Sequence, residues 1–531
     1  MFRLYVAKRI YRDKKKKMGY KKMSYIITSL PRFTLLSFTL LLVLFAGCSS
    51  TTTPKLSTSA NPPEEMNRQM GYLDDPDQVD RSSRSNTTIE SSVGLAGKTL
   101  LVDPLVRPVS TIKALYGVTL KSVTGYIERS FIEQVRLPSL ENKPVPPLAH
   151  AAPMDIVAWE QELDGLVSRS ASSGEIQFLV DGEAYFDRLT NAIDTAQESI
   201  DIRTYIFDND DVALDVADLL REKSDEVEVR ILVDGLADLF AANLDSDSLP
   251  ADTQLPASMS HYLTYESKVQ FRKQSNPWFT GDHAKITVID DDLAFVGGMN
   301  IGREYRHDWH DLMMEVSGPV VSQLQYEFDQ SWAKSSMLGD FAWFASAFDR
   351  PQAQDSDQAY PIRILSTSVH NSELYRAQVA AIRRARHHIF IENTYFSDDR
   401  ILLELVAARR RGVDVRVVLA SSGDNGMLDL SNQTAINTML RNGIRVFRYP
   451  GMTHVKAAVY DGWACLGSAN FDKLSLEVNH EINLGTSHPA TVENLLEKLF
   501  YPDFEKSEEL FEALPIGTRH HVAEWIADGF F

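Results

Sequence analysis

Hydrophobic positions in residues 183–207 change from a helical period to the alternating period of a strand. The stretch reads EAYFDRLTNAIDTAQESIDIRTYIF, and the same change occurs in residues 373–396, ELYRAQVAAIRRARHHIFIENTYF. Apolar residues three or four apart line one face of a helix, whereas alternation buries one face of a strand. A further helix and a buried strand follow each stretch, the strands being residues 227–233 and 413–419. Helices that alternate with short strands predict an α/β fold with a mixed, mostly parallel sheet.

The repetition of this order predicts how the chain is organised. Both stretches end in a Thr-Tyr pair that is followed closely by Phe, at Phe207 and at Phe396. A supersecondary unit that recurs in one chain indicates an internal duplication. We therefore expect two tandem α/β repeats, residues 174–345 and 360–513, which pack face to face about a pseudo-twofold axis and share one site.

The N-terminus predicts a secreted, lipid-anchored protein. A lysine-rich segment precedes the apolar run Phe33–Ala46, whose 14 residues are too few for the roughly 20 that a membrane-spanning helix needs. They suit a signal peptide, residues 1–47. Gly47 before Cys48 resembles the lipobox of bacterial lipoproteins, which implies lipidation of Cys48, and Ser49 favours the outer membrane of the cell envelope. An uncleaved anchor is the alternative.

Three further segments flank the repeats. Residues 48–92 are rich in Ser, Thr, Asn, Pro and Asp and predict a lipidated N-terminus that continues as a flexible tether. Residues 93–173 form an N-terminal extension to which the sequence assigns no chemistry. Residues 514–531 form a C-terminal tail.

Charge separates the N-terminus from the body of the protein. The net charge is −19, yet residues 1–47 carry eleven Lys and Arg and one acid, so the remainder carries −29. An acidic body repels a polyanion, which makes nucleic acid an unlikely partner. The second cysteine, Cys465, lies in an apolar run and is expected to be a buried small side chain without a disulfide partner.

Two matching motifs carry the candidate chemistry. His283-Ala-Lys285 is followed by Asp290 and by Gly-Gly-Met-Asn300, and His454-Val-Lys456 is followed by Asp461 and by Gly-Ser-Ala-Asn470. These residues resemble the paired HxKxxxxD motifs of the phospholipase D superfamily, over roughly residues 174–513. One such motif is weak, but two inside matching repeats are specific.

Strand geometry explains part of the motif. Residues i and i+2 of a strand face the same side, so each histidine and its lysine, His283 with Lys285 and His454 with Lys456, should point together. Asp290 and Asp461 fall just past the strand. They belong to the catalytic motif, and both the turn position and the resemblance give them a supporting role more than a chemical one.

Two carboxylates occupy equivalent places in the repeats. Asp311 lies 28 residues after His283, and Glu481 lies 27 residues after His454. The asparagines show the same difference of one residue between the repeats, since Asn300 follows its histidine by 17 positions and Asn470 by 16. An imidazole that reacts through one nitrogen needs its other nitrogen held by an acceptor. Our hypothesis is that Asp311 orients His283 and that Glu481 orients His454, with Glu477 as a competing choice for the second.

The motifs predict a reaction without cofactor or metal, because they offer Lys where a two-metal site would need clustered carboxylates. One histidine attacks phosphorus to form a phosphohistidine, and the other protonates the leaving oxygen and then activates the acceptor. The resemblance favours His283 as nucleophile. Lys285 and Lys456 would hold the phosphate oxygens, with Asn300 and Asn470 as neutral donors. The extra histidines His307, His310, His387 and His388 are expected to be surface or local structural residues.

Further stretches resemble the bacterial cardiolipin synthases, notably FVGGMNIG at residues 295–302 and the Gly318-Pro-Val-Val run that Trp332 follows. They imply a phosphatidyltransferase acting on phosphatidylglycerol or a similar phospholipid. A hydrolytic phospholipase D would use the same residues and is the alternative. A secreted nuclease is disfavoured by two motifs in one chain and an acidic body, and a non-enzymatic module by the intact motifs.

Two other segments are candidates for lipid contact. The aromatic pair Trp278-Phe279 shortly precedes His283 and could form an apolar lip. The segment Asp234–Gln270 is longer than its counterpart in the second repeat, and it is a candidate lid.

Overall fold

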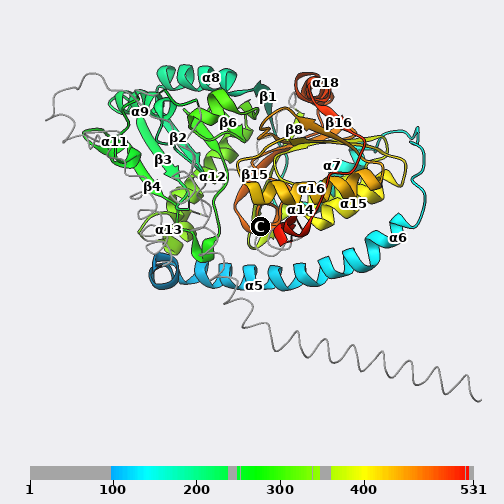
Figure 1. The fold of residues 1–531 in the computed structure, drawn as a ribbon. Coiled ribbons are helices and arrows are strands. Elements are labelled where there is room, and N and C mark those ends of the chain that lie inside the picture. Colours follow the sequence, from blue (N-terminus) through cyan, green and yellow to red (C-terminus); the bar gives the residue numbers. More distant parts are fainter. Residues whose placement is uncertain are drawn as a thin grey trace, which may run out of the picture.

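The structure is a computed structural model that describes residues 97–236, 248–250, 253–337, 339–346, 360–520 and 522–524. The signal peptide, Cys48, the tether, most of the candidate lid and the end of the tail therefore lie outside the described residues. Two α/β halves lie side by side, with helices on the outer faces of their strands (Figure 1).

The first half contains seven strands and the helices between them. Its elements are β1 (Ser172–Val180), α8 (Gly182–Thr195), β2 (Ser199–Thr204), α9 (Asp211–Lys223), β3 (Glu228–Val233), α11 (Met259–Thr264), β4 (Gln270–Lys273), η4 (Pro277–Phe279), β5 (Ile286–Ile289), β6 (Leu293–Gly297), η5 (Glu304–Asp308), β7 (Leu312–Ser317), α12 (Val320–Lys334) and α13 (Gly339–Ser346).

The second half repeats this order. Its elements are β8 (Tyr360–Ser368), β9 (Asn371–Ser372), α14 (Glu373–Arg384), β10 (His388–Asn393), α15 (Asp399–Arg409), β11 (Asp414–Ala420), α16 (Gly426–Arg441), β12 (Arg445–Tyr449), β13 (Lys456–Tyr460), β14 (Trp463–Gly467), η6 (Leu474–Val478), β15 (Glu481–Thr486), α17 (Pro489–Leu495), η7 (Leu496–Phe500), α18 (Tyr501–Lys506) and β16 (Glu508–Leu510).

The strand order shows the duplication directly. One half runs β1-β7-β6-β5-β2-β3-β4 and the other β8-β15-β14-β13-β10-β11-β12, and β1 pairs with β8 antiparallel where they meet. The sheet is mixed, as the sequence predicts, but the expectation of a mostly parallel sheet is wrong. Among the described strand pairs, only β2–β3, β3–β4, β10–β11 and β11–β12 are parallel. The hairpins β5–β6 and β13–β14, and the strands that pair beside them, are antiparallel.

Local sequence sets the ends of the outer helices. Asp210 accepts a hydrogen bond from Ala213 N at 2.7 Å and begins α9, and Asp398 accepts one from Ile401 N at 2.8 Å and begins α15. A side-chain oxygen at this position satisfies an N–H that the helix leaves unpaired. The equivalent caps follow β2 and β10, so the two copies turn from strand to helix in the same way.

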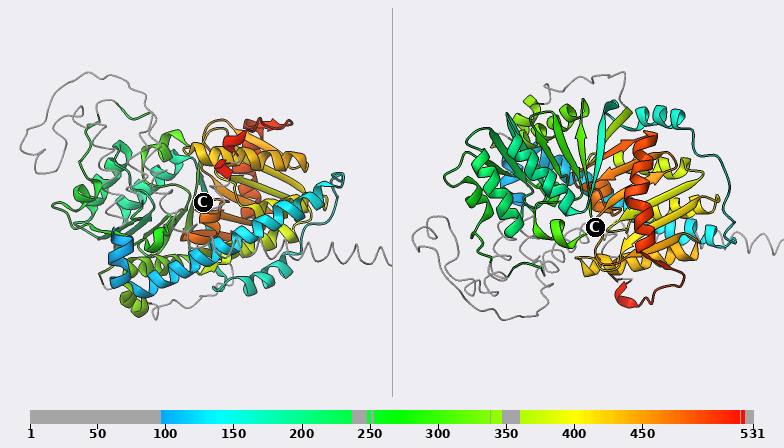
Figure 2. Two further views of the ribbon diagram at one scale, coloured as in Figure 1. Left: turned by 60° about the horizontal axis from the view of Figure 1, so that its bottom comes forward. Right: turned by 90° about the horizontal axis from the view of Figure 1, so that it is seen from above.

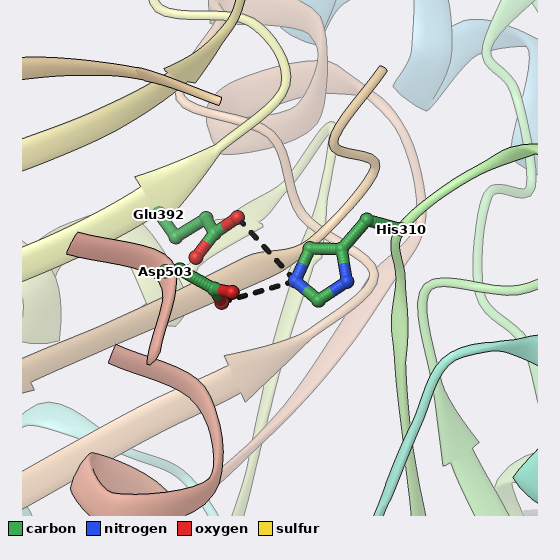
Figure 3. Close-up of side chains that lie close together, drawn as sticks. All are labelled: His310, Glu392 and Asp503. Atoms are coloured by element: carbon green, nitrogen blue, oxygen red, sulfur yellow. Dashed lines mark hydrogen bonds and ion pairs between the residues drawn. The ribbon is translucent and has the colours of Figure 1, made fainter. Parts of the chain in front are cut away.

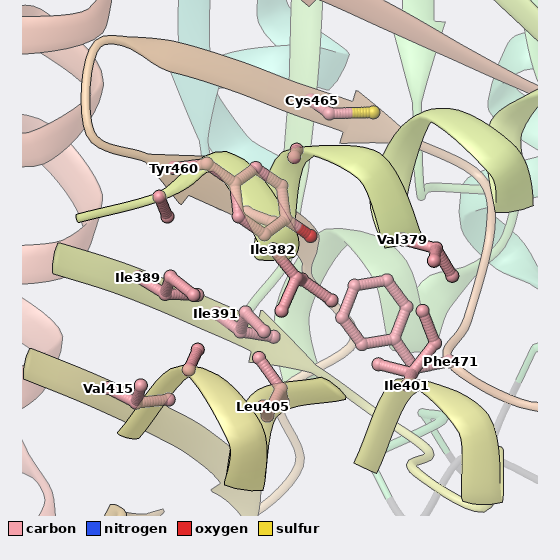
Figure 4. Close-up of a cluster of buried hydrophobic side chains, with 14 of the residues drawn as sticks. Val379, Ile382, Ile389, Ile391, Ile401, Leu405, Val415, Tyr460, Cys465 and Phe471 are labelled. Carbon is pink, nitrogen blue, oxygen red and sulfur yellow. The ribbon is translucent and has the colours of Figure 1, made fainter. Parts of the chain in front are cut away.

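Three large apolar clusters fill the molecule. The helices α14 and α15 of the second half pack on β10 and β11, where Ile382, Ile391 and Leu405 meet (Figure 4). The first half has an equivalent cluster around Phe186. A third cluster is common to both halves, because Ile286 and Val296 from one sheet pack with Ala457 and Leu466 from the other. This shared core fixes the two motif-bearing strands, β5 and β13, relative to each other.

The N-terminal extension is helical. It contains η2 (Lys98–Val102), α4 (Asp103–Val106), α5 (Pro108–Phe131), η3 (Ile132–Arg136), α6 (Leu137–Glu141) and α7 (Ile156–Leu166). The long helix α5 runs along the lower side of both halves, and the views of Figure 2 show the same arrangement (Figures 1 and 2). Within the described part of the chain, no helix is long and apolar enough to cross a membrane.

Candidate active site

The two motif histidines lie at the junction of the halves, each just before a strand of the shared core. His283 precedes β5 and His454 precedes β13. Each is held by backbone hydrogen bonds to the other half. His283 N donates to the carbonyl of His480 at 2.8 Å, and His454 N donates to that of His310 at 2.7 Å. The pseudo-twofold axis thus relates two identical backbone bridges.

Each imidazole is hydrogen-bonded to a carboxylate from the opposite repeat. His283 Nδ1 lies 3.0 Å from Glu481 Oε1, and His454 Nδ1 lies 2.6 Å from Asp311 Oδ2. As predicted, Asp311 and Glu481 are the carboxylates that bind the two motif histidines. The predicted pairing within each repeat is wrong. Asp311 holds His454, and Glu481 holds His283. Glu477, the competing choice, is not the partner of either ring.

The backbone bridges explain the exchange. His283 pairs with His480, whose next residue is Glu481, and His454 pairs with His310, whose next residue is Asp311. Each carboxylate therefore emerges beside the histidine of the other repeat. The spacing along the chain is the same for either assignment, so the sequence alone could not distinguish them.

The carboxylates are themselves fully buried and held from behind. Ser468 Oγ donates to Glu481 Oε2 at 2.6 Å. At the equivalent position in the first repeat, a Cβ on Gly298 would come within 2.3 Å of Asp311 Oδ1, so the glycine leaves room for that carboxylate. The sequence pattern does not predict either role, although both residues belong to the small-residue turn that follows each motif.

The two lysines lie beside the histidines. Lys285 Nζ donates to the carbonyl of His283 at 2.9 Å, and Lys456 Nζ donates to Thr394 Oγ1 at 3.0 Å. Burial lowers the pKa of Lys285 to about 7 and that of Lys456 to about 8. The charge of Lys456 also lowers the pKa of Lys285, because the two ammonium groups face one small region. Such a region attracts an anion.

The titration of the histidines follows from the same surroundings. Burial lowers the pKa of His283, while the charge of Glu481 raises it. Burial, both lysines and His283 hold the pKa of His454 well below its usual value. Burial raises the pKa of Asp311 to about 7. Both imidazoles are thus kept neutral in the absence of an anion, which leaves their Nε2 atoms as nucleophiles or bases.

The two asparagines differ in how their amides are used. Asn300 Oδ1 accepts from Thr204 Oγ1 and from Ile206 N, each at 3.1 Å, and its Nδ2 donates to Tyr305 Oη at 2.7 Å. One of its amide protons remains for another acceptor. Asn470 is buried, and its Oδ1 has no hydrogen-bond partner among the described residues.

Asp290 and Asp461 bind backbone rather than the imidazoles. Asp290 accepts from the N–H groups of residues 197–199 at 2.7–2.9 Å. Asp461 accepts from those of Met154 and of residues 386–388 at 2.7–3.0 Å. Both sit at the far end of the motif strand with positive φ, 54° and 52°. The supporting interpretation of these residues fits the geometry, and a chemical role does not.

Aromatic rings frame both histidines. Tyr205 lies edge-on to His283 with ring centroids 5.0 Å apart. Tyr305 and Trp309 lie 5.5 and 5.3 Å from His454. Such walls restrict the rotation of the imidazoles. The sequence marked Tyr205 only as a repeat signature, so its proximity to His283 is a finding of the structure.

A polar cluster lies behind each backbone bridge. The histidine of the first cluster is neutral, whereas that of the second is a cation. In the first, Arg203 Nε donates to Asp282 at 3.1 Å, and burial together with the charge of Arg203 lowers the pKa of the neighbouring His480 to about 3. His480 is therefore neutral.

In the second cluster, His310 Nδ1 lies 2.5 Å from Asp181. On the other side of the ring, Nε2 lies 3.0 Å from Asp503 and 3.8 Å from Glu392 (Figure 3). These acids raise the pKa of His310 to about 10, so it is a cation. His310 is thus a buried structural residue that supports His454. Because both ring nitrogens are engaged by carboxylates, the imidazolium has no lone pair with which to hold a metal ion beside Glu392 and Asp503.

The candidate lipid-contact segments are only partly described. Trp278 is half-buried in η4 with φ 53°, while the side chain of Phe279 and most of the lid candidate, including Leu239 and Phe240, lie outside the described residues.

Two histidine–carboxylate pairs and two buried lysines at a twofold junction define an enzyme that transfers or hydrolyses a phosphoester. The family model "Cardiolipin synthase, PLD-like domain" matches residues 189–332 and 379–501. The chain belongs to this phospholipase D-like family.

Its relatives include cardiolipin synthase A of Pseudomonas fluorescens, which is 31% identical over 64% of this chain and 70% of its own length. Cardiolipin synthase B of Salmonella typhi is 28% identical over 58% of this chain and 76% of its own length. The crystal structure of phosphatidylserine synthase from Haemophilus influenzae superposes with a TM-score of 0.54 at 13% identity. It covers 70% of this chain and 97% of the other, and at this identity it supports the fold alone.

Proposed function

We propose that this enzyme is a phosphatidyltransferase of the cardiolipin synthase type, which moves a phosphatidyl group from phosphatidylglycerol to a lipid alcohol. The observation that carries the proposal is the pair of crossed histidine–carboxylate contacts beside Lys285 and Lys456 in a member of this family. Phosphatidylglycerol is the donor that the resemblance favours.

The reaction would proceed in two displacements. The bound phosphodiester anion would favour protonation of His454 at Nε2. Nε2 of His283 attacks phosphorus to form a P–N bond, the P–O bond to glycerol breaks, and His454 gives its proton to the departing glycerol oxygen. The acceptor hydroxyl then loses its proton to His454 and attacks phosphorus, which breaks the P–N bond and restores His283. Glu481 and Asp311 hold the Nδ1 atoms throughout. Lys285, Lys456 and the amides of Asn300 and Asn470 would bind the phosphate oxygens.

The assignment of nucleophile rests on the family resemblance to the first motif. The electrostatics alone would favour His454, because its pKa is lowered more strongly. Denaturing the enzyme during turnover and digesting it at mildly alkaline pH would preserve the acid-labile P–N bond, and mass spectrometry of the peptides would place the phosphatidyl group on one ring. A label on residue 454 would reverse the two roles.

The principal test uses the full chain, phosphatidylglycerol vesicles and mass spectrometry of the products, with His283→Ala as control. Cardiolipin plus glycerol is the expected result. Phosphatidic acid plus glycerol would replace the proposal with the hydrolytic alternative. Loss of product in His283→Ala, with unchanged thermal unfolding, would link either product to the site.

We also propose that the chain is held in the cell envelope by lipid on Cys48, most simply at the outer membrane. The supports are the apolar run Phe33–Ala46 and the small residues before Cys48. Metabolic labelling with a fatty-acid analogue should mark the wild type and not Cys48→Ala. Equal labelling of both would remove the proposal.

A further inference from the structure

The helix α5 turns its large apolar side chains outward and its small residues toward the protein, the reverse of the usual arrangement. Its inner face is built from small residues, and Ala114 and Gly117 approach the protein so closely that a Cβ on Gly117 would come within 2.6 Å of Val369. Its large apolar side chains point outward. The outward set is Val109 49%, Ile112 66%, Tyr116 68%, Leu120 47%, Ile127 61% and Phe131 51% exposed.

These residues form one stripe. They recur at intervals of three, four or seven positions, which places them along one side of a helix. The stripe is extended at its start by Leu105 of α4, 83% exposed, and by Phe341 and Phe344 of α13, 70% and 58% exposed. The helix α13 packs against α5 and fixes its start, since Asp340 Oδ2 accepts from Val109 N at 2.8 Å. We call these residues the α5 surface. Exposed apolar side chains on one helix face and on the two helices packed against it mark an interaction site.

The α5 surface is fixed to the segments that carry the active site. The helix contacts η4, which ends four residues before His283, and η6, which ends three residues before Glu481. Lys121 donates to Ser372 Oγ at 2.8 Å and also to the carbonyl of Glu477. The surface is therefore held rigidly against both halves near the paired histidines.

The charge around this surface matches an anionic lipid rather than another copy of the acidic body. Residues 97–131 carry five Lys and Arg against two acids, a net +3 in a chain of −19. Arg107 is buried beside Asp103 and Lys121 bonds inward, so the exposed cation of α5 is Lys113. Of the acids at the end of α5, Glu128 is paired with Arg400, and Glu133 lies 2.9 Å from Arg129. Cations beside an apolar helix face are typical of helices that lie in the interface of a bilayer.

The chain that enters this surface carries the second argument. The described residues begin at Gly97, directly before η2 and α4. The sequence that precedes them contains the apolar run Phe33–Ala46 and Cys48. A tether from a membrane anchor would deliver the protein with the α5 surface toward the lipid.

We propose that the α5 surface inserts its apolar stripe into the interface of an anionic phospholipid bilayer and so holds the active site at the membrane. The proposal rests on the proposed function, because an enzyme acting on bilayer lipids must reach them at the interface. A second copy of the chain and a protein partner are the competing occupants.

The test compares Tyr116→Glu/Ile127→Glu in the full chain with a matched control, Phe511→Glu/Ile516→Glu. The control residues are also exposed, 83% and 41%, but they follow β16 in the chain and are not part of the α5 surface. Rates are measured on phosphatidylglycerol vesicles and on monomeric short-chain phosphatidylglycerol. Vesicles that contain a phospholipid with a photoreactive acyl chain report contact by peptide mapping.

We expect the α5 variant to lose at least about tenfold of its vesicle rate and to keep its rate on the monomeric substrate, while the control keeps both. The photoreactive lipid should label peptides from residues 105–131 in the wild type. Ile112→Glu supplies an independent variant on the same face. An unchanged vesicle rate together with absence of label on α5 would overturn the proposal, as would a wild-type dimer that the variant dissolves. If no substrate is turned over, the proposed function fails, and the labelling still decides the proposal.

Discussion

At the scale of single residues, the site depends on which carboxylate is hydrogen-bonded to each histidine. The spacing in the sequence identified Asp311 and Glu481 as equivalent residues, and the structure places both at Nδ1 of an imidazole. What the sequence could not supply was the register between the repeats, because a backbone bridge between distant segments leaves no trace in local spacing. The paired motifs, in contrast, could be identified from the sequence, because each lies within one strand and its turn.

Replacing one carboxylate should affect one ring. We expect Glu481→Gln to shift the imidazole ¹⁵N signals of His283 and leave those of His454 unchanged, with Asp311→Asn having the reverse effect. Turnover should fall on the order of 100-fold in each, less than in a histidine variant, because orientation is lost while the reacting nitrogen remains. A signal change at the histidine of the same repeat would contradict the crossed contacts.

Substrate affinity should depend on the charge of the lysines. A lysine is cationic below its pKa, and the values of about 7 for Lys285 and about 8 for Lys456 place the loss of charge between about pH 6 and 9. The KM for short-chain phosphatidylglycerol should therefore rise about three- to tenfold across this interval. Lys456→Arg, which stays charged, should flatten part of the rise. A constant KM from pH 6 to 9 in the wild type would show that the lysines stay charged.

At the scale of elements, the sequence predicted the parallel strand–helix–strand units and missed the antiparallel ones. The β2–α9–β3 and β10–α15–β11 units have the helical and strand periods that identify them. The hairpins β5–β6 and β13–β14 are joined by tight turns that hold Asp290 and Asp461, the last residues of the two HxKxxxxD motifs. Their carboxylates are instead turn-forming acceptors for backbone donors.

Asp461→Ala should therefore destabilise the fold without altering the chemistry. Four backbone N–H groups would lose their acceptor, and we expect a fall of about 2–4 kcal/mol in the free energy of unfolding. Urea denaturation measures this change, and kcat per folded molecule should stay near that of the wild type. Asp292→Ala, at an exposed turn position, is the control. A loss of kcat with full stability would return Asp461 to the chemistry.

At the scale of the whole molecule, the cationic His310 cluster joins the halves. The pKa of His310 is raised to about 10 and that of Glu392 to about 8. A group whose folded pKa is raised contributes stability below its unfolded pKa and loses it as pH rises through the folded value. We therefore expect Tm to fall from about pH 4.5 to 8 through Glu392 and from about pH 6.5 to 10 through His310.

His310→Gln should lower Tm at pH 7 and flatten this slope, as differential scanning calorimetry would show. The matched variant is His480→Gln, which replaces the neutral histidine of the other cluster and should leave the slope in place. A slope that His310→Gln does not change would assign the pH dependence to other groups.

The overall organisation was predictable because duplication is visible in a sequence, whereas the helical extension was not interpretable. The stripe of α5 is regular, yet its apolar side normally indicates the side that packs on the protein. Only the structure shows that Gly117 and Ala114 make that contact and that Ile112 and Tyr116 face outward.

The crossed carboxylates also bear on how such a chain can change over generations. A duplicated gene usually leaves one copy free to drift while the other keeps the original activity. Here Asp311 serves the histidine of the second copy and Glu481 that of the first. A damaging substitution in either repeat impairs the shared site, so selection acts on the two repeats together.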